Sequence, residues 1–527
     1  MKSLDKIKNI VWFILLGCVL SSCDDFLDRP AEDTYTIDGF YQTDEQCFQA
    51  VNPVYNSPWY DFQRGFFKIG DFLPGNYYAG SSPYLTFTIN STDEDLVSMS
   101  ASLWSVNAYC NEILLNIDTK SGSEVSEQTK LTVKGEALVW KSMAYFYLVR
   151  CFGAVPIIHS NSEKIAEGGY NDVYKATIEN VYDYIIMTLE QAIEWLPETN
   201  QPGRIDRYSA YGLLAKVYLT KSGYGMSGSR RQSDLDSAAY YSLKVIEESG
   251  RSLLPVYSDI FRLANNYNEE SLLAWHWTVS SMWTSANSFQ SDLGMTGFSE
   301  QGDSWGDWTG ISVDLQDAFD ESALNLTRNN YDSRRKATMM MYGDVYDYFW
   351  VDQGGFSYTD FCIDNIGEFR SPTGANAVKH LVGNNNDHIL GAGVGLDYMQ
   401  TSLSTHLLRL ADIYLICAEA VLGNNSSTSD SKAIDAFYQV RSRAIVSAVR
   451  PAQITWEDIW KERRLELACE GDRWYDYVRW HYYEPEKAIA ELTAQRRSYY
   501  NGLDNYYKTG IFERRLLIMM KIRLPLM

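Results

Sequence analysis

The chain has 527 residues, 45% of them hydrophobic, and a formal net charge of −22 at pH 7. That length and apolar content can supply one or two large hydrophobic cores. The acidic balance, with no basic patch to offset it, excludes nucleic acid and anionic lipid headgroups as favourable partners. Aromatic side chains are frequent, with 38 Tyr and 15 Trp, and such side chains either fill helix–helix cores or line wet binding surfaces.

Residues 1–22 have the features of a secretory signal peptide. Three lysines give a basic start, and residues 10–20 form an apolar run too short to span a bilayer, which needs roughly 20 residues. Cys23 follows directly, in an arrangement that resembles the bacterial lipoprotein signal, and Asp24 and Asp25 resemble the surface-export signal of Bacteroidetes lipoproteins. The alternative is an ordinary signal peptide with an incidental cysteine.

We therefore expect Cys23 to be acylated and residues 23–527 to form a single domain on the cell surface, anchored in the outer membrane. Each buried acyl CH₂ contributes about 0.8 kcal/mol to membrane binding. No other apolar stretch approaches spanning length, so the lipid is expected to be the only membrane contact.

Helical periodicity in the mature chain predicts a helical scaffold made of about 24–52, 104–250 and 405–527. Two stretches between these parts, about 53–103 and 251–404, largely lack that periodicity and are rich in Gly, Ser, Asn, Asp and aromatic residues. Long irregular stretches in a helical protein usually carry function. We expect both to lie together on one face of the scaffold.

Individual helices follow from apolar residues at spacings of three and four, with glycine, proline or a capping box at the ends. The expected helices are 134–152, 173–195, 207–219, 235–248, 406–422, 431–444 and a helix that opens at Thr455 and carries 462–469. In the second irregular stretch, Trp275 and Trp277 alternate with Ala274 and His276 in a short predicted strand. One of these two indoles is expected to belong to the core.

Aromatic side chains in the two irregular stretches are the candidates for ligand binding. A sugar ring has an apolar C–H face and a rim of hydroxyls, so it requires a flat aromatic surface with neutral or acidic hydrogen-bonding groups beside it. The candidates are Trp59, Tyr60, Asn76, Tyr77 and Tyr78 in the first stretch and Trp283, Asp303, Trp305 and Trp308 in the second. The alternative for each of them is a place in the core.

The sequence indicates no catalytic residue and no metal or organic cofactor. Its six histidines lack zinc-site spacing, and no phosphate loop, dinucleotide fingerprint or nucleophile elbow is present. A calcium ion held irregularly by the acidic loops stays open as a structural cofactor. The cysteines after Cys23 are far apart in sequence, which predicts free and mostly buried thiols rather than disulfides.

Several segments, taken in order, resemble the SusD/RagB family of Bacteroidetes nutrient-binding lipoproteins. ERRLEL at 462–467 with EGDRWYD at 470–476 and VRW at 478–480 is similar to that family's C-terminal signature. LRLADIYL at 408–415 and the segment from Glu136 to Pro156 are similar to two of its helices. The final residues, KIRLPLM, depart from the family's usual ending, so the C-terminal edge is expected to be truncated or divergent.

The resemblance implies a mainly α fold, with tetratricopeptide-like helix pairs, long aromatic-rich loops and a few short strands. It implies no catalysis. It also implies a lipid-anchored protein that captures an oligosaccharide or other nutrient and passes it to a SusC-like TonB-dependent transporter. From chemistry alone, the charged signature residues, such as Glu462, Arg463 and Asp476, are expected to interlock helices through ion pairs rather than to catalyse.

Two other function classes stay open at this point. A secreted glycoside hydrolase would use two carboxyl groups roughly 5 to 10 Å apart, and an acidic chain supplies many carboxylates. A helical-repeat scaffold would use its aromatic side chains to contact other proteins. The sequence does not identify the glycan, and a peptide ligand also stays open.

Overall fold

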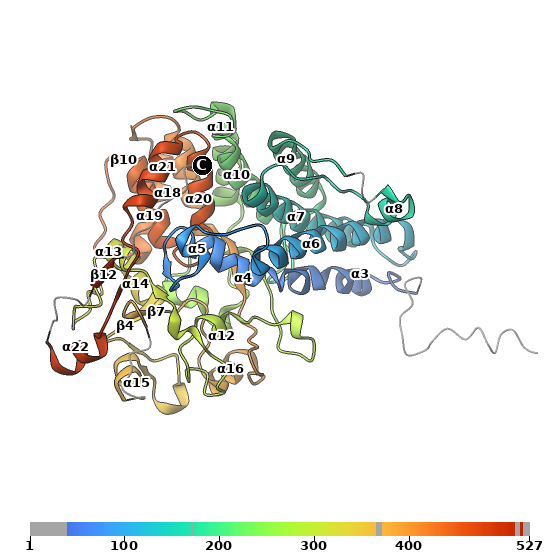
Figure 1. Ribbon diagram of the computed structural model, residues 1–527. Coiled ribbons are helices and arrows are strands. Elements are labelled where there is room, and N and C mark those ends of the chain that lie inside the picture. The colour runs from blue at the N-terminus through green and yellow to red at the C-terminus, as the bar shows by residue number, and fades with distance from the viewer. Residues whose placement is uncertain (1–38, 170–172, 365–370, 512–516, 520–527) are drawn as a thin grey trace, which may run out of the picture.

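The computed structural model describes residues 39–169, 173–364, 371–511 and 517–519. The predicted signal peptide, Cys23 and the last eight residues lie outside this range. Figure 1 shows most of the long helices in the upper part of the molecule and the loop-rich segments around α12, α15 and α16 below them. The predicted mainly α fold is confirmed.

Long helices form most of the scaffold, and each packs against the next in the order α6, α7, α9, α10, α11, α17 and α18. Such consecutive packing is the predicted tetratricopeptide-like arrangement of helix pairs. The helices are α3 (Asp44–Val51), α6 (Glu94–Lys120), α7 (Glu127–Phe152), α9 (Ile178–Trp195), α10 (Arg207–Lys221), α11 (Gln232–Glu248), α17 (Leu410–Leu422), α18 (Ser431–Ala444), α19 (Trp456–Glu466), α20 (Arg473–His481) and α21 (Pro485–Ala494).

Shorter helices lie mostly in the irregular stretches. They are α4 (Phe62–Phe67), α5 (Pro83–Thr86), α8 (Asn161–Ala166), α12 (Phe289–Leu293), α13 (Val313–Ala318), α14 (Ser333–Thr338), α15 (Tyr358–Asp364), α16 (Asn385–Ala392) and α22 (Leu503–Thr509). The strands of the described ranges form two-stranded antiparallel pairs: β1 (Tyr77–Tyr78) with β3 (Gly310–Ile311), β2 (Ser271–Trp275) with β8 (Thr405–Arg409), β4 (Met339–Met341) with β7 (Ala375–Ala377), β5 (Val345–Tyr346) with β6 (Phe356–Ser357), β9 (Ser427–Thr428) with β10 (Ile454–Thr455), and β11 (Ser498–Tyr500) with β12 (Leu517–Met519).

Several predicted boundaries are wrong. Helix α7 begins at Glu127 rather than at 134, and α9 begins at Ile178 rather than at 173. Helix α6 begins at Glu94, inside the stretch predicted as irregular, because Asp93 caps it and its first turns are polar. The predicted helix 406–422 starts instead as strand β8, which pairs with β2, and turns helical only at Leu410. Helix α19 ends at Glu466, before the predicted position 469.

The two irregular stretches contact each other, as predicted. Tyr77 of β1 lies opposite Ile311 of β3. The side chain of Gln63 on α4 donates to the carbonyl oxygen of Ala286 at 3.1 Å and accepts from the backbone N–H of Ser288 at 3.0 Å. These bonds fix the segment before α12 on α4.

Buried ion pairs join the helices of the C-terminal block, as the signature residues predicted. Arg463 lies between Asp412, at 2.6 Å, and Asp476, at 3.0 Å. Glu466 accepts from Arg409 at 3.1 Å and from Arg443 at 2.5 Å. Since the side chains of these pairs are at most 5% exposed, we infer that they hold β8, α17, α18, α19 and α20 together.

The signature glycine Gly471 has a steric explanation. Its φ is +74°, and a Cβ built there would lie 2.5 Å from the ring of Phe66. Its backbone N–H donates to Oδ2 of buried Asp71 at 2.7 Å. Only glycine permits this close approach between the C-terminal block and α4.

The cysteines that the structure describes are free, as predicted, and all are buried except the half-buried Cys151. In the same ranges, no helix combines the length and the apolar character that crossing a bilayer requires.

Candidate functional site

Most of the candidate residues that the sequence singled out prove to be buried. Their exposed fractions are 0% for Trp59, 0% for Asn76, 1% for Tyr77, 4% for Asp303 and 8% for Tyr78. The prediction of direct ligand contact is wrong for these side chains in this structure.

Trp59 lies in the main hydrophobic core. Its Nε1 donates to the carbonyl oxygen of Val54 at 2.8 Å. Its ring centroid lies 5.5 Å from that of Trp140 on α7 and 5.3 Å from that of Trp275 on β2. Trp275 and Trp277 are both core residues, at 0% and 2% exposed. This aromatic cluster fastens the first irregular stretch to the scaffold.

Asn76, Tyr77 and Tyr78 form the turn into β1 and its two residues. The Asn76 amide donates to Oδ1 of Asp71 at 2.9 Å. Tyr77 belongs to the main core, and the ring of Tyr78 lies 5.4 Å from that of Tyr499. All three side chains are therefore enclosed by packing, which the polar local sequence did not reveal.

Asp303 is a positioning residue. Ser299 donates to its Oδ1, and the backbone N–H of Met399 donates to its Oδ2 at 2.7 Å. Because both carboxylate oxygens are engaged, Asp303 ties the 299–305 turn to the segment before β8.

The remaining candidates are accessible. Trp283, Trp305 and Trp308 are 39%, 37% and 45% exposed, and Tyr60 is half-buried. Indole rings left this open on a soluble surface are unusual and are characteristic of contact sites.

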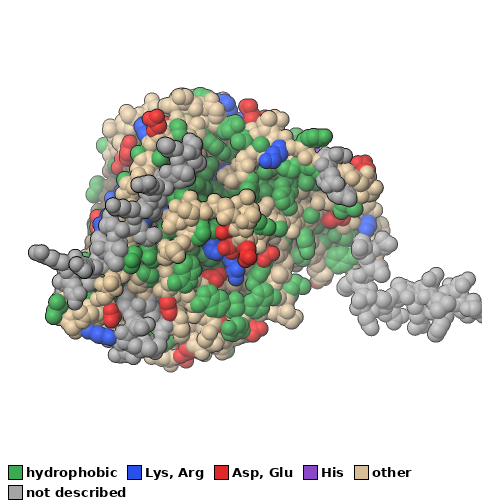
Figure 2. All heavy atoms as spheres, viewed as in Figure 1, with side chains coloured by type: hydrophobic (Ala, Val, Ile, Leu, Met, Phe, Trp, Pro, Cys, Tyr) green, Lys and Arg blue, Asp and Glu red, His purple; other side chains and the backbone are tan. Residues whose placement is uncertain are grey.

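Tyr60 and Trp283 share one cleft of about 340 Å³. Its other lining residues are Asp61, Arg64, Glu94, Asp95, Ser98, Ser288, Asp292 and Met399. They come from α4, the start of α6, α12 and the two flanking loops. Figure 2 shows acidic and basic side chains gathered over α4 in the middle of this face, with hydrophobic side chains directly beside them.

Asp292 connects the cleft to a third aromatic residue. The indole Nε1 of Trp305 donates to Oδ1 of Asp292 at 3.2 Å. The backbone N–H of Trp305 donates to the carbonyl oxygen of Ser291 at 3.0 Å. Trp305 is thus held at the cleft's edge by both its backbone and its side chain.

Trp308 lies at the end of the same short segment. Its ring centroid lies 6.2 Å from that of the buried Phe72, in an edge-to-face arrangement. The ring is therefore seated on the core at one edge, while much of its surface faces outward.

The electrostatics of the cleft favour a neutral ligand. Asp61, Glu94, Asp95 and Asp292 supply four carboxyl groups, whereas Arg64 lies 4.0 Å from Asp95 and Lys68 is also paired with Asp95. Burial raises the pKa of Asp292, and Arg64 and the Trp305 indole oppose this shift. Burial also raises the pKa of Tyr60, whose oxygen interacts with Trp283.

Sequence reasoning missed Asp292, Arg64, Asp95 and Met399 as members of this site. The charged residues lie on short or newly recognised helices, and nothing in their local sequence distinguishes them from surface charges. Met399 lines the cleft from a distant loop, and its backbone N–H bonds to Asp303.

Within the described ranges, no three His, Cys, Asp or Glu side chains gather closely enough to hold a metal ion.

Comparison with known proteins agrees with the fold. A family model described as "SusD family" matches residues 255–517, and one described as "Starch-binding associating with outer membrane" matches 81–219. A SusD-like protein of Bacteroides ovatus is 34% identical over 486 residues, covering 91% of this chain and 84% of that protein.

Solved structures give the same result. A protein crystallised with xylogluco-oligosaccharide is 32% identical, with a TM-score of 0.75, and the match covers 86% of each chain. A laminarin-binding SusD-like protein is 22% identical, with a TM-score of 0.65, over 86% of this chain and 94% of that one. The second likeness is one of fold alone.

Proposed function

This chain belongs to the SusD family, and on that premise we propose that it captures neutral oligosaccharides on the face formed by Tyr60, Trp283, Trp305 and Trp308. The protein holds its ligand by aromatic stacking and hydrogen bonding and catalyses no reaction on it. Captured ligand passes to a SusC-like TonB-dependent transporter in the outer membrane.

One observation carries this proposal: the exposed indole of Trp283 and the half-buried phenol of Tyr60 line a cleft with four carboxyl groups, and the exposed indole of Trp305 bonds to one of these groups, Asp292. The Trp305–Asp292 bond of 3.2 Å holds one ring in place before ligand arrives. A preorganised aromatic surface loses little entropy on binding. The flat rings suit the C–H face of a sugar, and the carboxylates of Asp292 and Asp61 can accept hydrogen bonds from its hydroxyl groups.

Two observations point to the class of ligand: the charge of the cleft and the ligand crystallised with a relative. Four carboxyl groups in the cleft disfavour a uronic-acid or sulfated glycan, because each would bring a like charge. The relative crystallised with xylogluco-oligosaccharide, at 32% identity, makes neutral glucans the first class to test.

The lipid anchor and the transporter belong to the same proposal. Cys23, once acylated, would keep the cleft close to the outer-membrane pore. Tethering raises the effective concentration of captured glycan at the transporter, so a weak site can suffice. Co-purification of a TonB-dependent transporter with the detergent-extracted protein tests this part.

The experiment for the central proposal is affinity electrophoresis in native gels that contain xyloglucan, laminarin, starch or pectin. We expect a neutral glucan to retard the protein and the anionic pectin to leave its mobility unchanged. A protein that migrates equally in every gel would contradict the proposal.

The two rival functions are separated by direct assays. A glycoside hydrolase would release reducing ends when incubated with the retarding polysaccharide, and we expect none. Support for binding without catalysis comes from Asp95, whose carboxylate is paired with Lys68 and Arg64. A scaffold without a ligand would co-purify with protein partners and bind no glycan in the gels.

A further inference from the structure

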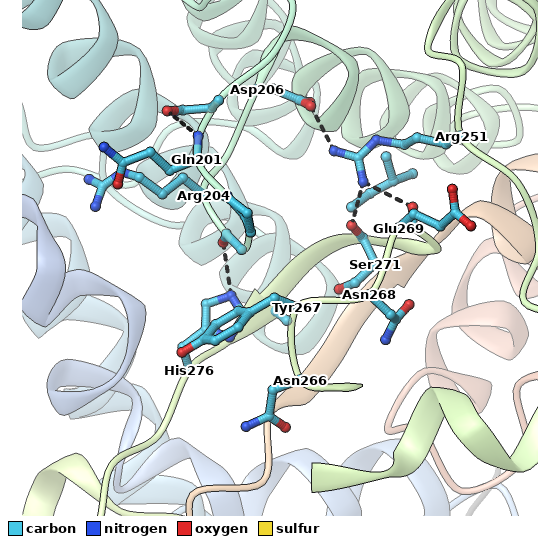
Figure 3. Close-up of a pocket in the computed structure, with 15 residues that line it drawn as sticks. Gln201, Arg204, Asp206, Arg251, Asn266, Tyr267, Asn268, Glu269, Ser271 and His276 are labelled. Carbon is cyan, nitrogen blue, oxygen red and sulfur yellow. Dashed lines mark hydrogen bonds and ion pairs between the residues drawn. The ribbon is translucent and has the colours of Figure 1, made fainter. Parts of the chain in front are cut away.

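A second hollow lies beside the cleft, around Tyr267. One part, of about 250 Å³, is lined by the turn at 200–206 and by 266–276, and an adjoining part of about 300 Å³ adds Asn52, Tyr55, Asn56 and Thr278. Figure 3 shows Tyr267 lying across His276, with Gln201 and Arg204 on the opposite side. Tyr267 is 56% exposed, so the hollow contains an open aromatic ring.

Hydrogen bonds make the walls of this hollow rigid. Arg251 donates to the carbonyl oxygens of Glu269, at 3.0 Å, and Ser271, at 2.8 Å, and to Oδ2 of Asp206 at 2.6 Å. Figure 3 shows these bonds as dashed lines. The wall therefore exists without a ligand, which is the condition for a preorganised site.

Tyr267 is itself held in a fixed position. Its ring centroid lies 4.9 Å from that of His276, and His276 bonds to the carbonyl oxygen of Gly203 at 2.8 Å. A Cβ at Gly203 would lie 2.3 Å from the Tyr267 ring. Glycine at this position, where φ is +83°, lets the turn support one side of the ring while the other side stays open.

Three polar groups at the hollow have no hydrogen-bond partner within the described part of the chain: the Tyr267 hydroxyl, the Gln201 side-chain amide and the Glu269 carboxylate. All three side chains are exposed. They can donate to and accept from sugar hydroxyls.

The charges again select a neutral ligand. Arg204 is engaged by Glu136 through two bonds, at 2.9 and 2.7 Å, and Arg251 is engaged by Asp206. Burial lowers the pKa of His276 to about 4, so its ring is neutral at pH 7. Glu269 is left as the uncompensated charge, which disfavours an anionic glycan.

Two short segments, 56–60 and 278–285, contribute lining residues to both the hollow and the cleft, and we call these two segments the ridge. Asn56 and Thr278 line the hollow, whereas Tyr60 and Trp283 line the cleft. Both pairs belong to the same two short segments, 56–60 and 278–285. The backbone N–H of Thr278 donates to the carbonyl oxygen of Ser285 at 2.8 Å, which closes the second segment.

Apolar surface lies on top of this ridge. Met282 is 59% exposed, and its sulfur lies 3.9 Å from Oγ of Ser57. A sugar chain can cross such a surface with its C–H face against the thioether.

We propose that the Tyr267 hollow is an outer subsite of the same ligand path, so that a long neutral oligosaccharide stacks on Trp283, crosses the ridge at Met282 and stacks again on Tyr267. This inference rests on the proposed function. It predicts that the protein distinguishes long chains from short ones.

The test is calorimetric titration with xyloglucan oligosaccharides of increasing length, using the full mature protein. We compare Tyr267→Ala and Gln201→Ala with Tyr240→Ala, a control in which a 55% exposed tyrosine on α11 is removed. For the longest chains we expect Tyr267→Ala to bind about three- to tenfold more weakly. The shortest chains should bind all these variants as they bind wild type.

Gln201→Ala guards against a folding artefact, because its side chain makes no bond within the described residues. It should weaken long-chain binding in the same direction. Unchanged long-chain affinity in both Tyr267→Ala and Gln201→Ala overturns the subsite while leaving the Trp283 cleft in place. Absence of binding by the wild-type protein at every length overturns the proposed function, and the subsite with it.

Discussion

The indole Nε1 of Trp305 donates to Oδ1 of Asp292 at 3.2 Å, so an exposed aromatic ring is held by a half-buried carboxylate in the wall of the cleft. Burial raises the pKa of that carboxylate above its ordinary value of 3.8. The structure therefore links the position of a candidate ligand-binding ring to a group whose charge is costly to bury.

Replacing Asp292 by asparagine tests that link. A raised folded-state pKa means that ionisation opposes folding, so the penalty appears as pH rises from 3.8 through the raised value. Asparagine keeps an acceptor for Trp305 without the charge. We expect Asp292→Asn to increase the free energy of unfolding at pH 7 and to lose this advantage below pH 3.8.

Urea denaturation at pH 7 and below pH 3.8 measures the difference in the free energy of unfolding between Asp292→Asn and wild type. Asp61→Asn, at an exposed residue of the same cleft, is the control and should show a smaller pH-dependent change. An Asp292→Asn protein less stable than wild type at pH 7 would show that the ionised carboxylate stabilises the fold.

Truncation of Trp59 and truncation of Trp283 should have different effects on the free energy of unfolding. Trp59 is fully buried against Trp140 and Trp275, so Trp59→Ala should lower the free energy of unfolding by about 3–5 kcal/mol. Trp283 is 39% exposed, so Trp283→Ala should leave stability within about 0.5 kcal/mol of wild type.

Thermal unfolding of both variants, together with affinity electrophoresis of Trp283→Ala, provides the measurement. We expect Trp283→Ala to unfold normally and to be retarded less in glucan gels. Comparable destabilisation by the two substitutions would refute the assignment of one ring to the core and the other to the surface.

Glu466 is the centre of an acid-sensitive ion-pair network. Burial by itself would raise the pKa of Glu466, but Arg443, Arg409 and Arg334 lower it to about 2. Its folded pKa is below the ordinary 4.5, so the stabilisation is present above pH 4.5 and is lost as the pH falls toward 2.

Glu466→Gln should therefore destabilise the protein by about 3–5 kcal/mol at pH 7, because three arginines lose a shared partner. The difference in the free energy of unfolding between Glu466→Gln and wild type should become smaller as the pH falls from 4.5 toward 2. Equilibrium unfolding across that range is the measurement, with Glu457→Gln on the exposed side of α19 as the matched control. A stability difference that does not change with pH would exclude the charge of Glu466 as the cause of the destabilisation.

Cys23 is expected to be the membrane anchor. Cys23→Ser should remove acylation and release the protein into the soluble fraction, since no other apolar stretch of the sequence reaches spanning length. Cell fractionation and incorporation of labelled palmitate measure this. Membrane retention of Cys23→Ser in high salt would mean that another contact anchors the protein.

The helical scaffold was largely predictable because its helices carry strong periodic patterns with standard ends. The 431–444 helix has the predicted bounds, and Gly153 ends α7 as expected. Helix α6 was missed at its start because only Met99 and later residues bury a regular face. Leu407 and Leu408 fit a helical pattern, but pairing with β2 draws them into a strand.

The site was predictable as a region and not residue by residue. Trp59 and Trp283 stand in similar surroundings of Ser, Asn and Pro or Thr, yet one is buried and the other exposed. The difference is set by Trp140 and Trp275, which are far away in sequence. Asp292 was not predictable at all, because its importance comes from a bond to Trp305 that only the fold creates.

The central claim is that neutral oligosaccharide is held by exposed indoles on one face of an inert helical scaffold. Calorimetric titration of xyloglucan oligosaccharide into the triple variant Trp283→Ala, Trp305→Ala and Trp308→Ala, beside wild type and Tyr240→Ala, tests it most directly. We predict heat of binding for wild type and for Tyr240→Ala, and none for the triple variant with an unchanged unfolding temperature. Binding of equal affinity by the triple variant would contradict the account.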